Sequence, residues 1–140
     1  MASAAKLYTP QILALATGLA AHPFDPAMPH QGAARSPSCG STLAVSIATD
    51  AGGRIAELGV RAQACAIGQA SAAVFAAGAI GRTRADIATS AAAIAGWLAD
   101  GGQLPDWPDL EQIAPAAAYP ARHGAIMLAW KAALDALSTA

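Results

Sequence analysis

Charged residues are scarce in this sequence. They make up 12% of its 140 residues, with 8 lysines and arginines against 9 aspartates and glutamates. There is no run of like charge, and a protein that binds nucleic acid or an anionic membrane surface normally carries a basic patch. We therefore expect neither nucleic acid nor a membrane as a partner.

Cysteines and long apolar runs are also few. Two cysteines are too few for a disulfide framework and are typical of a reducing compartment, although they would allow one Cys39–Cys65 bridge. No stretch approaches the roughly 18 apolar residues of a membrane span. The apolar run from Lys6 to Ala21 faintly resembles a secretion signal, but Thr9-Pro10 within it favours a helix start. The sequence thus predicts a cytoplasmic protein.

Apolar residues, by contrast, make up 55% of the chain, and many of them are alanine. Alanine favours helices and buries little area per residue, so the core must depend on a small set of larger side chains. The length suits one domain, which we place at residues 1–140.

The hydrophobic pattern predicts a β-hairpin in the first half of the chain. Leu43, Val45 and Ile47 alternate with smaller or polar residues, Asp50-Ala51-Gly52-Gly53 has turn chemistry, and residues 54–63 read as the returning strand. The alternation slips once after Ile55, which indicates a bulge or a strand buried on both sides. Residues 22–39 contain four prolines and are expected to form a loop.

Helical spacing marks the remaining segments. A first helix is expected after Thr9, a second after Cys65, a third from the capping sequence at Thr83 to Gly101, and a last one after Pro120. The third and last helices are separated by a linker rich in proline and a short turn after Leu110.

The most reactive position in this plan is Cys65, where the strand pattern ends and a helical pattern begins. A thiol in the first turn of a helix lies near unpaired backbone N–H groups and the positive end of the helix dipole, which favours the thiolate. Cys65 is therefore a candidate ligand or nucleophile. The alternative is a small buried apolar residue.

Two further residues are expected near Cys65. Cys39 precedes the first hairpin strand and Cys65 follows the second, so an antiparallel pairing brings them to one edge of the sheet. His123 begins the apolar stripe of the last helix and is expected to point inward, either as a ligand or as a core histidine bonded to a carbonyl. Cys39, Cys65 and His123 together form a Cys2His set suited to zinc or iron.

At this point the chain resembles a family, the iron–sulfur cluster assembly scaffolds of the IscU, SufU and NifU N-terminal type. The likeness runs from about Leu7 to the C-terminus. Its motifs are Pro37-Ser38-Cys39-Gly40, Gly53-Arg54-Ile55, Cys65-Ala66-Ile67-Gly68-Gln69-Ala70-Ser71-Ala72, Pro120-Ala121-Arg122 and Met127-Leu128-Ala129-Trp130.

The resemblance implies an α+β domain with a small antiparallel β-sheet and helices packed mainly on one face. It implies Cys39 and Cys65 as metal ligands. Two positions depart from the family pattern, because Ser41 stands where an aspartate is usual and Ala125 stands where the third cysteine is usual. His123 is the nearby residue that can replace the lost thiol.

Three functions follow as hypotheses. The first is a non-enzymatic scaffold that holds iron, a transient iron–sulfur cluster or zinc at Cys39, Cys65 and His123, with a cysteine desulfurase and acceptor apo-proteins as partners. The second is a divergent homologue that uses the site for zinc or for docking another protein. The third is a thiol enzyme with a Cys65–His123 dyad. We expect a monomer or a weak homodimer.

Overall fold

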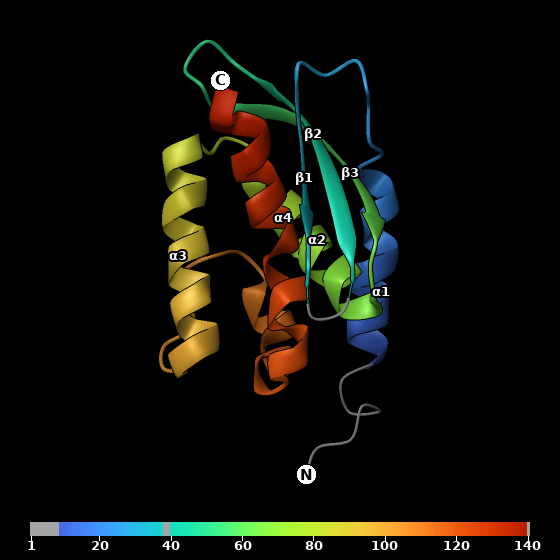
Figure 1. Ribbon diagram of the computed structural model, residues 1–140, viewed down its shortest axis with the longest axis vertical. Helices are drawn as coiled ribbons and strands as arrows, with labels where there is room; N and C mark the ends of the chain where they lie inside the picture. Colours follow the sequence, from blue (N-terminus) through green and yellow to red (C-terminus); the bar gives the residue numbers. More distant parts are fainter. Residues whose placement is uncertain (1–8, 38–39, 140) are drawn as a thin grey trace.

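The computed structural model describes residues 9–37 and 40–139 of the chain. It has the predicted α+β architecture, in which a three-stranded antiparallel sheet is packed against helices (Figure 1). The long elements are α1 (Pro10–Gly18), β1 (His30–Arg35), β2 (Thr42–Thr49), β3 (Ile55–Gln63), α2 (Ala66–Ala79), α3 (Arg84–Asp100) and α4 (His123–Ala136). Shorter 3-10 segments are η2 (Leu19–Ala21), η3 (Leu110–Ala118), η4 (Pro120–Arg122) and η5 (Leu137–Thr139).

The sheet has the strand order β1-β2-β3, so the predicted hairpin forms its centre and one edge. Thr42 pairs with Gln63 at the end of the hairpin that leads to Cys65. The slip in the alternation is a real irregularity, because the register shifts between Ala48 and Thr49 and sets Thr49 opposite Ile55. The hairpin and its bulge are both confirmed.

The loop predicted for residues 22–39 is wrong in its second half, where β1 forms the other edge of the sheet. Its inward residues include Gly32 and Ala34, which are too small to give a readable period of two. They are small because α4 lies very close. A Cβ atom at Gly32 would stand 2.3 Å from the backbone nitrogen of Ala136. The exposed carboxylate of Asp135 also accepts a hydrogen bond from the backbone N–H of Ala33 at 3.0 Å.

The core lies between the sheet and the helices, with α4 at its centre. Phe75, Trp107 and Trp130 form an aromatic cluster with ring centroids 5.1 to 5.5 Å apart. Trp107 is held by a hydrogen bond from its Nε1 to the carbonyl of Val74 at 3.0 Å. Gly78 makes room for it, because a Cβ atom there would lie 2.7 Å from the same Nε1. This cluster fixes the segment before η3 against α2 and α4.

The helix starts follow the signals in the sequence. The Thr9 side chain accepts a hydrogen bond from the backbone N–H of Ile12, with Pro10 as the first helical residue. The predicted capping box of α3 is present, because Thr83 Oγ1 accepts from the N–H of Asp86 and the Asp86 carboxylate accepts from the N–H of Thr83. In the described part of the chain, no helix is long and apolar enough to cross a membrane.

The capping box predicts a pH-dependent contribution to stability. The hydrogen bond from the Thr83 backbone, helped by the Thr83 side chain, lowers the pKa of Asp86 below the ordinary value of an aspartate. A carboxyl whose pKa is lowered on folding stabilises the fold above its unfolded pKa and loses that contribution as the pH falls through the folded pKa.

We therefore expect Asp86→Asn to lower the urea midpoint at pH 7 and to converge on wild type as the pH falls through the lowered pKa of Asp86. Asp100→Asn, at the other end of the same helix, is the control. It removes a negative charge near the helix C-terminus and should leave the midpoint unchanged or slightly raised. A deficit for Asp86→Asn that persists undiminished in acid would contradict the assignment.

Candidate thiol and metal site

Cys65 occupies the N-cap of α2, directly after β3. Its backbone is extended, with φ −63° and ψ 168°, and its side chain makes no capping hydrogen bond. The residue is half-buried and forms no disulfide with any residue in the described ranges. The first turn of α2 contains no acidic residue. The thiol is therefore partly accessible and lies beside the N–H groups of a helix start.

The hydroxyl of Ser41 contacts the backbone of Cys65. The backbone N–H of Cys65 donates to Ser41 Oγ at 3.4 Å. Ser36 and Ser41 close the connection between β1 and β2, since the N–H of Ser36 donates to the carbonyl of Ser41 at 2.8 Å. Gly40, directly before Ser41, has a φ of 71°, a conformation that suits glycine. The ends of the hairpin thus meet as predicted, at the edge that carries Cys65.

Cys39 lies outside the described residues. The described residues before and after the pair Ser38-Cys39 are Pro37 and Gly40, and the N–H of Gly40 donates to the carbonyl of Ser36 at 2.8 Å. The short connection that carries Cys39 therefore starts and ends at the sheet edge next to Cys65. That the two thiols share a metal stays a prediction.

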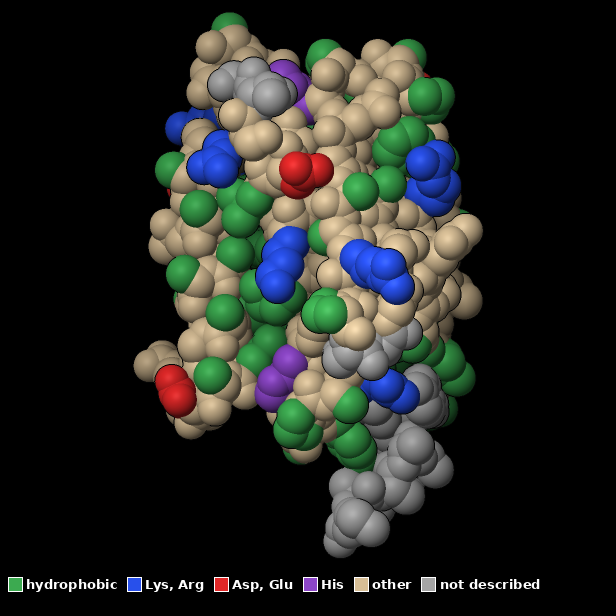
Figure 2. All heavy atoms as spheres, in the orientation of Figure 1, with side chains coloured by type: hydrophobic (Ala, Val, Ile, Leu, Met, Phe, Trp, Pro, Cys, Tyr) green, Lys and Arg blue, Asp and Glu red, His purple; other side chains and the backbone are tan. Residues whose placement is uncertain are grey.

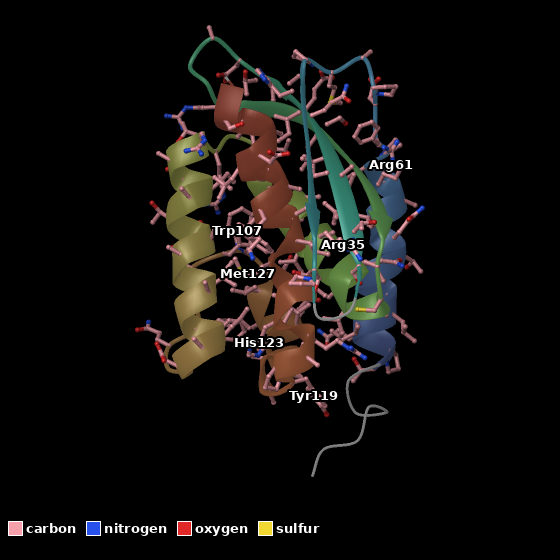
Figure 3. All side chains as sticks on the ribbon, in the orientation of Figure 1. Arg35, Arg61, Trp107, Tyr119, His123 and Met127 are labelled. Carbon is pink, nitrogen blue, oxygen red and sulfur yellow. The ribbon has the colours of Figure 1, made fainter. Side chains whose placement is uncertain are left out.

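His123 is the first residue of α4 and is half-buried, as expected. Its Nε2 atom lies 2.7 Å from the carbonyl oxygen of Ala117 in η3. The carbonyl can only accept, so Nε2 donates in this contact and Nδ1 is the ring nitrogen that is not used in it. In Figure 3 the ring lies beside the lower part of α4 and below Met127.

The missing third cysteine position can also be located. Ala125 is 1% exposed, and its Cβ lies 3.5 Å from the point that a Cβ of Gly68 would occupy, in the first turn of α2. Ala125 therefore faces the helix start that holds Cys65. His123 is two residues earlier, about 200° around the helix axis, and its ring contacts η3 instead.

Ser41 thus contacts Cys65, Ala125 faces the first turn of α2, and His123 lies on a different side of α4. Among residues 9–37 and 40–139, no three His, Cys, Asp or Glu side chains are grouped closely enough to hold a metal ion. The set of Cys39, Cys65 and His123 would thus need both the approach of Cys39 and a shift of His123 at the start of α4. The assignment of His123 as a ligand stays a prediction.

Two supporting residues escaped the sequence analysis. Gln69 donates from Nε2 to the carbonyl of Ala64 at 2.9 Å and fixes the peptide before Cys65. Gln69 stands four residues after Cys65, and residues at this spacing are neighbours on a helix, so the spacing could have indicated a side chain that supports the start of α2. Arg35 had no such signal, because β1 was read as a loop. It pairs in register with Thr42, at the end of the sheet where β3 leads to Cys65.

Arg35 also belongs to a basic surface. Figure 2 shows several lysine and arginine side chains on the visible face of the molecule and few acidic ones, and Figure 3 places Arg35 on β1 and Arg61 on β3. Both arginines are exposed, and Arg61 stacks on Phe24 with its Cζ 4.3 Å from the ring centroid. The two arginines thus place positive charge near the end of the sheet that leads to Cys65.

Comparison with known proteins gives results at the level of structure. No family model and no curated protein matches the sequence. A nitrogen-fixing NifU-like protein (N-terminal) from Brucella abortus shares 27% identity, covers 94% of this chain and 92% of its own, and superposes with a TM-score of 0.84.

A second solved structure is a candidate iron–sulfur cluster assembly scaffold protein for the SUF system from Fervidobacterium islandicum. It shares 23% identity, covers 96% of this chain and 99% of its own, and has a TM-score of 0.75. A third, described only as a hypothetical protein, has a TM-score of 0.68 at 17% identity over 91% of this chain and 96% of its own. The resemblance read from the sequence is thus confirmed, and the chain is structurally similar over nearly its whole length to the NifU-like and SufU-type iron–sulfur scaffold proteins.

Proposed function

We propose that this protein is a scaffold or carrier that holds iron, a transient iron–sulfur cluster or zinc as its cargo at Cys39, Cys65 and His123. The observation that carries the proposal is the position of Cys65. Its half-buried thiol stands at the N-terminus of α2, next to Ser41 and to the connection that carries Cys39. The likeness to solved scaffold structures gives this position its functional context.

The donor set fits a soft or borderline metal. Thiolates suit iron–sulfur clusters and zinc, and an imidazole suits zinc or iron. Three protein ligands leave a coordination position open, as exchangeable cargo requires. Ala125 and Ser41 offer neither the thiol nor the carboxylate expected of the family, so the cargo should be held less tightly and released more readily.

The contact between His123 and Ala117 supports an alternative function in which the bound metal is zinc. A histidine that ligates a metal commonly donates its other ring N–H to a backbone carbonyl, which orients the ring. Nε2 of His123 makes that kind of contact, so Nδ1 would be the ligating atom. In this version the protein is a zinc-binding or docking homologue without cluster assembly.

Access to the site agrees with exchange between proteins. Cys65 is only half-buried, and Pro37 and Gly40, the described residues that flank positions 38 and 39, are exposed. A cysteine desulfurase could deliver sulfur to Cys39 or Cys65, and acceptor apo-proteins could receive the cargo there. These partners are part of the proposal.

Anaerobic reconstitution with iron and sulfide tests it. We expect wild type to develop a visible absorption band and to retain iron after desalting, whereas Cys65→Ser and Cys39→Ser should lose most of both. Circular dichroism confirms that the variants fold, and Ser138→Ala, at an exposed position near the C-terminus, is the control substitution. Cluster and metal content unaffected in both cysteine variants would refute the proposed site.

The same preparation decides the role of His123. If His123 is a ligand, His123→Ala lowers the bound metal as strongly as a cysteine variant does. If the histidine only braces η3 through Ala117, the metal content of His123→Ala stays at the wild-type level. Tight zinc without an absorption band would select the zinc-binding version.

A further inference from the structure

A second site is suggested by a hollow that shares no residue with the thiol site. It has a volume of about 300 Å³ and lies between α3 and the segment 105–107. Its polar side chains come from Arg82, Asp86, Thr89, Ser90 and Asp106. Its apolar wall is formed by Ala93 and Pro105, with the buried Ile94 and Trp107 behind them. The volume is at the lower end of those found for small-molecule sites, which typically combine an apolar wall with a few convergent polar groups.

Arg82 is held in a fixed orientation at the wall of the hollow. Its Nε donates to the carbonyl of Gly78 at 2.6 Å, and its Cζ lies 4.0 Å from the ring centroid of Trp107. Trp107 is itself 3% exposed and anchored on Val74. Figure 3 shows Trp107 between α3 and α4. Arg82 forms no ion pair within the described ranges, so its two terminal nitrogens are left to bind a carboxylate as a fork.

The carboxylates of the hollow set a limit on the ligand. Asp86 uses Oδ2 to accept from the N–H of Thr83, which leaves Oδ1, and Asp106 is exposed. A phosphate would bring up to two negative charges beside both aspartates, so it is disfavoured. A primary ammonium group is favoured there instead, because it can donate to a carboxylate and to the hydroxyls of Thr89 and Ser90.

We propose that this hollow binds a small zwitterion, an α-amino acid with an apolar side chain. Its carboxylate pairs with Arg82, its ammonium group with Asp106, and its side chain lies on the accessible part of the apolar wall, formed by Ala93 and Pro105. The site is separate from the metal cargo of Cys65, so the two proposals stand or fall independently.

NMR titration with L-leucine tests the proposal, with isopentylamine and 4-methylpentanoate as probes that lack one of the two charges. We expect saturable shifts at Ser90, Ile94 and the Trp107 indole with leucine, and at least tenfold weaker binding of each single-charge probe. A charge-assisted hydrogen bond contributes enough for a factor of this size.

Two variants separate the charged contacts. Arg82→Gln should weaken leucine binding at least tenfold and leave isopentylamine unaffected, whereas Asp106→Asn should weaken leucine and leave 4-methylpentanoate unaffected. Arg84→Gln, an exposed arginine outside the hollow, is the control and should bind as wild type. The proposal is overturned if leucine gives no saturable shift up to its solubility limit, or if Arg82→Gln, folded by its indole signal, binds leucine as wild type does.

Discussion

Replacing Ala125 with cysteine is expected to raise the affinity for Zn²⁺ about 100-fold. Structural zinc sites with four ligands bind with roughly 10–16 kcal/mol, so one ligand contributes on the order of 3 kcal/mol. Ala125 faces Gly68 in the first turn of α2, three residues after Cys65. A sulfur atom on its Cβ would enter the space beside the thiol of Cys65 and complete a three-thiol site with Cys39.

The cost of this change is modest. Ala125 is 1% exposed, so the added sulfur must be fitted into a packed region, at about 1–3 kcal/mol of folding stability. Ala129→Cys is a matched control, because Ala129 is also 1% exposed and lies one turn further along α4. It should bear a similar stability cost and bind zinc as wild type does.

The measurement is a competition titration against a chromophoric chelator under reducing conditions. Equal zinc affinities for Ala125→Cys and Ala129→Cys would mean that position 125 does not face the metal. An increase in Ala125→Cys that disappears when Cys65 is also changed to serine would show that the new thiol and Cys65 bind the same ion. The double variant therefore ties the gain to this site.

The parts of the fold that the sequence predicted are those with strong local signals. Alternating Leu43, Val45 and Ile47 led to β2, and the slip after Ile55 led to the register shift at Ala48 and Thr49. The capping sequence at Thr83 led to the start of α3. Each of these signals depends on neighbours within a few residues, so no knowledge of tertiary contacts was needed.

The parts that escaped depend on contacts between distant segments. β1 was read as a loop because its small residues are dictated by α4, about 100 positions later in the chain. η3 is longer than the single turn expected after Leu110, and its residues Leu110, Ile113 and Ala116 are buried against the core despite Pro115. Tertiary packing overrode a weak local preference in both segments.

The candidate site shows the same division. The meeting of the hairpin ends beside Cys65 followed from strand pairing alone. The inward position of His123 also followed from helical spacing, but its partner, the Ala117 carbonyl, belongs to η3 and could not be foreseen. Spacing places a side chain on a face of a helix, whereas only the packing of the next segment decides which group it meets.

Gly32→Ala is expected to destabilise the fold by at least about 3 kcal/mol, above the usual range for a small added group. A Cβ atom at Gly32 would lie 2.3 Å from the nitrogen of Ala136 and 2.4 Å from the carbonyl oxygen of Ala132. Both are backbone atoms of α4, so no side-chain rotation can relieve the clash, and β1 must separate from the helix. The loss is a large share of the roughly 5–15 kcal/mol that stabilises a domain.

Urea denaturation measures this loss, and Gly96→Ala is the control. Gly96 lies within α3, and a Cβ atom there would meet nothing within 4 Å. Alanine at that position should stabilise the protein by about 0.5–1 kcal/mol, because it restricts the unfolded chain and favours the helix. A Gly32→Ala variant within about 1 kcal/mol of wild type would contradict the close packing of β1 on α4. β1 leads directly to the connection that carries Cys39. A displaced β1 should therefore also lower metal binding in Gly32→Ala, which would show that the proposed site depends on the close packing of β1 on α4.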